Sequence, residues 1–174
     1  MVDTRAERHV YGAAAAPVVV VEFGDLECPH CRAAAPLLRT LVDESGGQVR
    51  LVWRHFPLFE VHPYALTAAL ASESAAAAGR FWDWHDTAIA HQDRLGDVDL
   101  RRYAAGLGLD PDDAVGEQAQ KYAAAVEADY VAGLGLGVRG TPTLFVDGVR
   151  FEGPVELPAL RAAVEAASRC HTLR

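Results

Sequence analysis

Two neighbouring stretches decide the fold of this chain: Val18-Val19-Val20-Val21-Glu22-Phe23 and, one short turn later, Cys28-Pro29-His30-Cys31. The first is a continuous run rich in β-branched residues, which predicts a strand buried on both faces in the middle of a sheet. The second opens a segment from Arg32 to Val42 with helical periodicity. Two thiols three residues apart at a helix start can close a disulfide. Cys28 lies where free N–H groups and the positive end of the helix dipole stabilise a thiolate.

The segment after this helix completes a β-α-β unit. Ser45-Gly46-Gly47 ends the helix, in which Pro36 is expected to introduce a kink. Val49, Leu51 and Trp53 then mark every second position, which predicts a second strand. A parallel crossover is the default arrangement of two strands joined by a helix.

Residues 62–137 carry helical patterns and no strand signal. About four helices are expected, beginning near His62, Phe81, Val98 and Asp110. The last start is strong, because Asp110 favours the N-cap and Pro111 favours the first turn. These residues are therefore predicted to form a helical insertion.

Strand patterns return near the end of the chain. Residues 143–146 and 149–151 flank Asp147-Gly148, a dipeptide typical of a two-residue hairpin turn, and a final helix follows. The order is β-α-β, a helical block, then β-β-α, which predicts one α/β fold. We expect residues 1–61 and 138–174 to form a single domain that the helical block interrupts.

Composition narrows the class of protein. In 174 residues, 51% are apolar, which is enough for a sizeable core. The net charge of −8 and the lack of a Lys/Arg cluster argue against nucleic-acid binding. Three cysteines, Cys28, Cys31 and Cys170, are too few for a disulfide-stabilised mini-protein, and Cys170 is interpreted as a bystander thiol.

The beginning of the chain shows no leader pattern. Residues 1–8 contain no long apolar run, and the later run 13–21 is broken by Pro17 and followed by Glu22. No membrane-spanning segment is expected either. The sequence as it stands therefore predicts a cytoplasmic protein, whereas removal of a leader would imply an exported one.

Two motifs bear on the chemistry, and each has an alternative interpretation. The Cys-x-x-Cys pair fits a redox dithiol or half of a zinc site, although no second Cys-x-x-Cys or His pair at finger spacing follows. Gly140-Thr141-Pro142-Thr143 fits an ordinary loop proline or a cis Thr141–Pro142 bond that turns the backbone of residue 141 toward a bound peptide. Together with the dithiol, the cis interpretation is favoured.

These motifs together resemble the DsbA-like thiol-disulfide oxidoreductases of the thioredoxin superfamily, over nearly the whole chain. The matching segments are 18–23, 28–31, Pro36, Arg54-His55-Phe56-Pro57, His62-Pro63, Phe81-Trp82 and 140–143. The resemblance implies a thioredoxin fold with a central mixed sheet and an inserted helical subdomain. It also implies that Pro142 is the cis-proline and that the backbone of Thr141 pairs with substrate.

The predicted mechanism centres on Cys28 as nucleophile and Cys31 as its partner. The thiolate of Cys28 would gain from the helix start, where Pro29 and His30 separate the cysteines, and from a protonated His30. Glu22 is expected to accept or relay the proton of Cys31, because the DsbA type has an acid at the matching position. The expected partners are protein or peptide thiols and disulfides, with a redox partner of unknown identity, no cofactor and no metal.

Other residues are predicted to be structural. The acidic side chains of Asp25 and Glu27 are interpreted as a solvated turn, and His55, His62, His85 and His91 as structural or surface residues. Phe81, Trp82 and Trp84 are expected to form the core of the insertion.

Two further functions stay open at this stage. One is a glutathione-dependent transferase or isomerase of the same fold, which would usually carry serine at the position of Cys28. The other is a non-catalytic module that binds metal or protein through an idle dithiol. The direction of electron flow is also open, because DsbA oxidases with Pro-His usually have valine where this chain has Thr141.

Overall fold

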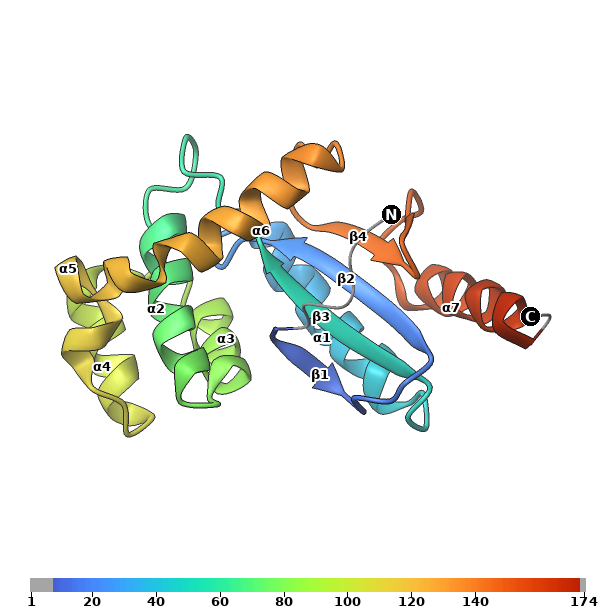
Figure 1. Cartoon of the computed structure of the whole chain (residues 1–174), viewed down its shortest axis with the longest axis horizontal. Coiled ribbons are helices and arrows are strands. Elements are labelled where there is room, and N and C mark those ends of the chain that lie inside the picture. The colour runs from blue at the N-terminus through green and yellow to red at the C-terminus, as the bar shows by residue number, and fades with distance from the viewer. Residues whose placement is uncertain (1–7, 173–174) are drawn as a thin grey trace.

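The β-branched run forms β2 (Val18–Gly24), the central strand of a five-stranded mixed sheet (Figure 1). In the computed structural model, which describes residues 8–172, the strand order is β1-β3-β2-β4-β5. β2 pairs in parallel with β3, and the other neighbouring pairs are antiparallel. The remaining strands are β1 (Val10–Gly12), β3 (Val49–His55), β4 (Thr143–Val146) and β5 (Val149–Arg150).

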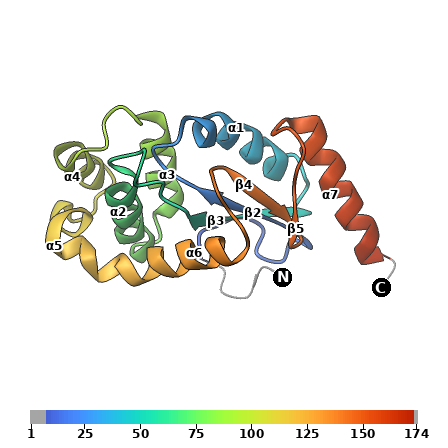
Figure 2. The same cartoon turned by 90° about the horizontal axis from the view of Figure 1, so that it is seen from above.

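Helices cover both faces of this sheet and extend beyond one end (Figures 1 and 2). They are α1 (Pro29–Asp43), α2 (Ala65–Ala77), α3 (Phe81–Ala90), α4 (Asp97–Gly106), α5 (Gly116–Ala119), α6 (Ala123–Gly135) and α7 (Leu157–Thr172), with short 3-10 turns at Pro111–Ala114 and Gln120–Tyr122. The predicted α/β order is confirmed, since α2 to α6 all lie between β3 and β4.

β2 is buried on both faces, as its sequence predicts. Val18 and Val20 pack with Leu38 of α1 and Leu160 of α7, and the intervening valines pack on the other face, near Tyr130 of α6. Figure 2 shows α1 and α7 on one side of the sheet and α6 on the other. Side chains alternate along a strand, so Glu22 lies on the side of β2 that faces α1.

The hairpin prediction is confirmed by its backbone angles. Asp147 and Gly148 have φ values of 48° and 80°, both in the left-handed region that a two-residue hairpin turn requires. Asp147 also accepts a hydrogen bond from the backbone N–H of Val19 through its carboxylate at 2.8 Å. This bond ties the turn to the central strand.

Two elements differ from the sequence predictions. The sequence patterns predict no strand before Val18, but β1 pairs with β3 at the sheet edge. The helix predicted from Asp110 is interrupted, because Val115 is extended and Gly116 has a φ of 65°. Asp110 nevertheless caps the first short turn by accepting a bond from Asp112 N.

The helical insertion shares a hydrophobic core with the dithiol segment. Phe81 and Trp84 of α3 are buried, as predicted, in a cluster that also contains Trp53, Cys28 and Cys31. The division of the chain into 1–61 with 138–174 and an insertion 62–137 stays a prediction. Residues 1–7, on which the expected lack of a leader depends, lie outside the described residues, as do 173–174.

Candidate active site

The two cysteines lie at the start of α1, where that helix meets the insertion. Cys28 is the N-cap residue, directly before Pro29 at the first helical position, and Cys31 is inside the first turn. Cys31 has no exposed surface and Cys28 has 2%, while Pro29 and His30 between them are exposed. Both cysteines are free thiols. The dithiol is therefore positioned by helix geometry at the border between core and solvent.

The environment of Cys28 favours its thiolate. The largest effect on the pKa of Cys28 is a hydrogen bond from the Cys31 thiol, which lowers it. Burial raises this pKa, whereas hydrogen bonding with Thr141 and with the backbone N–H groups of Cys31 and His30 lowers it further. Together they lower the pKa of Cys28 to about 5. The structure shows His30 acting on Cys28 through its backbone N–H, and the contribution of a protonated imidazole stays a prediction.

Cys31 has the opposite environment. Burial, the bond to Cys28 and the charge of Glu22 raise the pKa of the Cys31 thiol well above its ordinary value. Its sulfur accepts only a long hydrogen bond, 3.4 Å, from the backbone N–H of Asp25. At neutral pH the pair consequently holds one thiolate, on Cys28, and one thiol, on Cys31.

Glu22 is the buried acid on the α1 side of β2. It is 1% exposed, and within the described chain its Oε1 atom has no hydrogen-bond partner. Burial, and secondarily the charge of Cys28, raise the pKa of Glu22 to about 8. Glu22 can therefore hold or release a proton near neutral pH.

The Thr141–Pro142 loop faces the dithiol from the start of β4. The peptide bond between these residues is cis, and the carbonyl oxygen of Thr141 lies 3.4 Å from the Cys28 sulfur. A groove of about 340 Å³ runs between this loop and α1, lined by His30, Ala33, Ala34, Leu37, Thr141, Pro142 and Val155. The structure thus brings the predicted residues Cys28, Cys31 and His30 together with Thr141 and Pro142.

Asp25 is a site residue that sequence reasoning missed. It was interpreted as part of a solvated turn, but it is only 2% exposed. Its carboxylate accepts bonds from the backbone N–H groups of Glu27 and Leu58 and contacts the His62 ring at 2.7 Å. Its backbone carbonyl accepts the N–H of Cys28 at 3.1 Å. One buried carboxylate thus fastens the dithiol loop to the loop after β3.

Gln92, in the loop after α3, fastens the same segment from the insertion. Its side-chain amide donates to the backbone carbonyls of Leu26 at 3.0 Å and Cys28 at 2.8 Å. No local pattern predicts this contact, because a lone Gln in a loop has no distinctive signature. The insertion therefore contributes directly to positioning the nucleophile.

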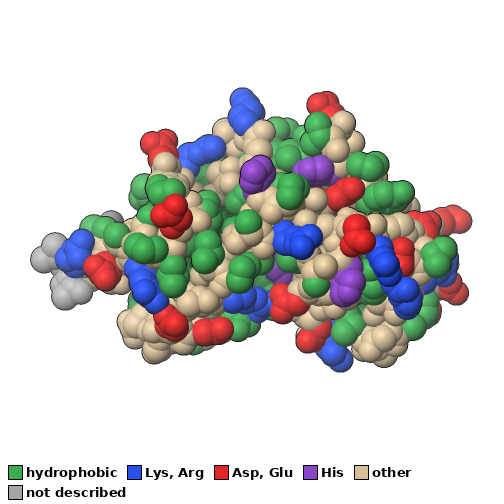
Figure 3. Space-filling model, turned by 180° about the vertical axis from the view of Figure 1, so that it is seen from behind, with side chains coloured by type: hydrophobic (Ala, Val, Ile, Leu, Met, Phe, Trp, Pro, Cys, Tyr) green, Lys and Arg blue, Asp and Glu red, His purple; other side chains and the backbone are tan. Residues whose placement is uncertain are grey.

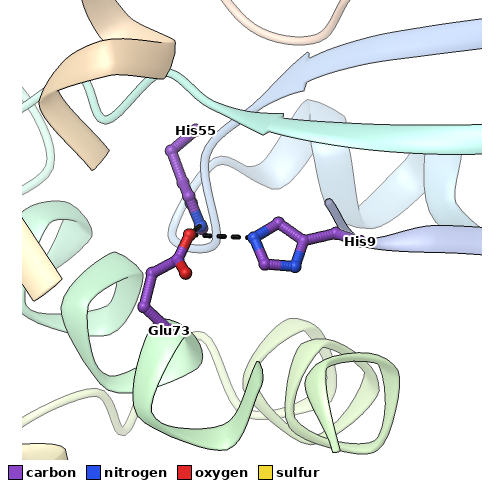
Figure 4. A group of neighbouring side chains, drawn as sticks. All are labelled: His9, His55 and Glu73. Carbon is purple, nitrogen blue, oxygen red and sulfur yellow. Dashed lines mark hydrogen bonds and ion pairs between the residues drawn. The ribbon is translucent and has the colours of Figure 1, made fainter. Parts of the chain in front are cut away.

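A second cluster of titratable side chains lies beside β3. His9, His55 and Glu73 place three ligand-type atoms within 4.8 Å of one another (Figure 4). Glu73 reaches into the cluster from α2, and the described residues contain no other group of three with this ligand geometry. The arrangement raises the question of a metal site.

The hydrogen-bond pattern does not fit a metal. Glu73 Oε1 already lies 2.7 Å from the Arg8 guanidinium and 2.8 Å and 3.2 Å from the Nε2 atoms of His9 and His55. The indole N–H of Trp53 donates to His55 Nδ1 at 3.2 Å, so a neutral His55 ring carries its hydrogen on Nε2. A metal ligand needs a lone pair at that nitrogen. The cluster is a closed set of charged hydrogen bonds.

We expect Glu73→Gln to lower the free energy of unfolding by about 1–3 kcal/mol, since hydrogen bonds to a charged acceptor are lost in a buried place. Although burial alone would raise it, the bonds to His55 and His9 hold the pKa of Glu73 well below its ordinary value. Urea unfolding at neutral pH measures the change. Equal stability of Glu73→Gln and the exposed control Glu127→Gln would contradict it.

The thiolate of Cys28 should be visible in a pH titration. In reduced protein carrying Cys170→Ser, thiolate ultraviolet absorbance is expected to appear with a midpoint near pH 5, because the pKa of Cys28 is about 5. The same titration of Cys28→Ser provides the control and should lack this step. A midpoint near 9, the ordinary value for cysteine, would show that the site does not activate Cys28.

Comparison with known proteins identifies the family of this chain. The thioredoxin family model matches residues 4–166, so the chain belongs to the thioredoxin superfamily, and its structural neighbours are the DsbA-like thiol-disulfide oxidoreductases. The resemblance seen in the sequence is thus confirmed, together with the thioredoxin-like fold.

Among solved structures, a thioredoxin-like oxidoreductase from Silicibacter pomeroyi has a TM-score of 0.79 and 29% identity, over 92% of this chain and 91% of that one. BdbD from Bacillus subtilis in its oxidised form has a TM-score of 0.81 over 93% of each chain, and at 24% identity it supports the fold alone.

A curated relative adds a different context. The Na(+)/H(+) antiporter NhaA 3 of Salinispora tropica is 48% identical over 167 residues, which are 95% of this chain and 26% of that protein. This chain spans about a quarter of the length of the curated relatives it matches. Between residues 8 and 172, the structure has no helix that is both long and apolar enough to cross a membrane.

Proposed function

We propose that this protein exchanges disulfides with protein or peptide thiols through a mixed disulfide on Cys28. The observation that carries the proposal is the asymmetry of the pair: a thiolate-forming Cys28 beside a buried, protonated Cys31, at the edge of a groove. The thiolate is the attacking species in thiol-disulfide exchange, and a low pKa also makes Cys28 a good leaving group.

In the oxidising direction, a substrate thiolate attacks the Cys28 sulfur of the Cys28–Cys31 disulfide. The S–S bond breaks, Cys31 leaves with the electron pair, and it takes up a proton. A second substrate thiolate then attacks the substrate sulfur of the mixed disulfide and releases the Cys28 thiolate. The substrate loses two electrons and the cysteine pair gains them.

In the reducing direction, the same atoms act in reverse. The Cys28 thiolate attacks a substrate disulfide, and Cys31, once deprotonated, attacks the Cys28 sulfur and releases the reduced substrate. Because the pKa of Cys31 is high, this step needs a proton acceptor. Glu22, buried on the α1 side of β2, is proposed for that role in its ionised form.

The groove beside the Thr141–Pro142 loop supports a peptide substrate. The chain of a substrate can lie along the loop, and the backbone of Thr141 is proposed to pair with it. Ala33, Leu37 and Val155 make the groove wall largely apolar. On the face seen in Figure 3, acidic and basic side chains are interspersed, which suits a protein partner better than a nucleic acid.

Two alternatives are less well supported. A glutathione-dependent transferase of this fold would usually replace the first cysteine, whereas Cys28 is retained. A metal-binding module would need more ligands than the two sulfurs, and no further His, Asp or Glu of residues 8–172 completes a ligand group with them. Sodium and proton exchange is the activity named for the antiporter relatives, of which this chain spans about a quarter. The cellular compartment of this protein stays a prediction.

Equilibration with glutathione buffers tests this function. We expect the Cys28–Cys31 pair to pass between dithiol and disulfide in one two-electron transition, read by alkylation and mass spectrometry in Cys170→Ser protein. A potential of about −120 mV would indicate an oxidase and one of about −270 mV a reductase, so the measured value would decide between the two directions. A pair that forms no disulfide at any glutathione ratio would contradict the proposal.

A further inference from the structure

His62 is connected to both cysteines through a single residue, Asp25, which contacts all three. The His62 Nδ1 atom is 2.7 Å from Asp25 Oδ2. The backbone N–H of Asp25 donates to the Cys31 sulfur at 3.4 Å, and its carbonyl accepts from the N–H of Cys28 at 3.1 Å. Asp25 therefore contacts the histidine through its side chain and the dithiol through its backbone.

His62 lies in the loop that follows β3, and hydrogen bonds to the dithiol loop hold this loop in place. The N–H of Leu58 donates to the Asp25 carboxylate at 2.9 Å, and the N–H of Tyr64 donates to Glu27 Oε2 at 2.7 Å. These bonds fasten both ends of the loop that carries His62. The His62 side chain is 19% exposed, so its ring can exchange a proton with water.

The charges that act on this ring come mainly from the dithiol loop. They are those of Asp25, Cys28 and Glu27, and all three are negative when ionised. The segment that carries His62 adds Glu60. Burial alone would lower the pKa of His62, but the bond to Asp25 and the charges of Asp25, Cys28 and Glu27 outweigh it and raise the pKa. One of these charges, that of Cys28, exists only in the reduced state.

We propose that His62 is a positioning residue that takes up a proton when the Cys28–Cys31 disulfide is reduced and releases it when the disulfide re-forms. The proposal rests on the proposed exchange function and adds a proton site to it. A protonated His62 favours the Cys28 thiolate, and the thiolate equally favours protonation of His62, because the coupling between two sites is reciprocal.

The proton balance shows what His62 contributes. A substrate dithiol that becomes a disulfide gives up two electrons and two protons, and both electrons enter the cysteine pair. One proton stays on Cys31, while Cys28 leaves as a thiolate. The second proton goes to water, to Glu22 if its carboxylate is ionised, or to His62 if its ring is neutral. Reduction is thereby favoured as pH falls through the titration range of His62.

Nuclear magnetic resonance of the histidine rings tests the coupling directly. We expect the titration midpoint of His62 to be higher in the reduced than in the oxidised protein by at least about 0.3 unit, which is a twofold change in proton affinity. His91 is exposed and bonds to the backbone carbonyl of Thr87, so it serves as the internal control and should not change. Equal midpoints for His62 in both states would overturn the proposal.

Two matched variants provide the second arm. His62→Gln keeps a hydrogen-bond donor for Asp25 and removes the positive charge of the histidine. The midpoint of Cys28 thiolate formation should therefore rise by as much as the His62 midpoint differs between the two redox states. The titration is kept below the midpoint of His62, where the wild-type ring is charged. His91→Gln should leave the Cys28 midpoint unchanged. An unchanged Cys28 midpoint in folded His62→Gln would overturn the coupling, and the resonance measurement decides the matter if this variant does not fold.

Failure of the exchange function looks different. If no Cys28–Cys31 disulfide can be formed, the proposed function is wrong, although the His62→Gln titration still measures the coupling to the thiolate. If the disulfide forms and exchanges normally while His62 titrates identically in both states, only the proton-uptake proposal is wrong.

Discussion

Cys28→Ser is expected to reduce the protein-catalysed rate of insulin disulfide reduction by about 10³-fold, so that insulin is reduced at the rate of dithiothreitol alone, because the activated thiol is removed. Cys28 is the thiol whose pKa is lowered to about 5, while the pKa of Cys31 is raised. The hydroxyl of a serine at this position stays protonated at neutral pH and is a much weaker nucleophile than the Cys28 thiolate. Insulin precipitation with dithiothreitol as reductant measures the rate.

Cysteine variants at the other two positions separate the roles. Cys170→Ser is the matched control and should retain wild-type activity, because Cys170 lies exposed on α7, outside the candidate site. Cys31→Ser should lose turnover but still form adducts with substrate. Cys28→Ser that is as active as the wild type would remove the basis of the proposed mechanism.

Glu22→Gln is expected to change the pH dependence of stability strongly. The pKa of Glu22 is about 8 in the folded protein and 4.5 for the ordinary group. Folding therefore takes up a proton between these values, and the wild type loses stability as pH rises through this window. Glutamine cannot ionise, so the advantage of Glu22→Gln over wild type should grow by about 3–4 kcal/mol between about pH 5 and pH 8.

Urea unfolding of the reduced proteins at several pH values measures this difference. Any pH-independent loss of stability caused by the glutamine side chain does not affect the result, because only the change of the stability difference with pH is compared. Glu127→Gln, at an exposed position on α6, should show no such growth. A constant difference between Glu22→Gln and wild type across the range would mean that Glu22 does not hold a proton in the folded state.

Much of the fold could be predicted because its signals are local. A few adjacent residues specify each element: the continuous run before Phe23 predicts a strand, the Cys-x-x-Cys pair predicts a helix start, and Asp147-Gly148 predicts a hairpin. Resemblance then linked the distant Thr141–Pro142 loop to the dithiol, and the structure places its carbonyl 3.4 Å from the Cys28 sulfur.

The rest depends on contacts between residues far apart in the chain. Asp25 and Glu27 look like a solvated turn until the loop after β3 places the N–H groups of Leu58 and Tyr64 against them. Gln92 reaches Cys28 across the insertion with no local pattern. β1 was missed for the same reason: three residues form a strand only because the edge of β3 is available to pair with them.

Mixed-disulfide trapping tests the central claim most directly. Reduced Cys31→Ser protein, with Cys170→Ser to remove the third thiol, is treated with oxidised glutathione at about pH 6 and mapped by peptide mass spectrometry. The account predicts one glutathione adduct, on Cys28, whose formation rate rises with the thiolate of that residue. Absence of an adduct on Cys28, while a denatured sample of the same protein reacts, would contradict the account.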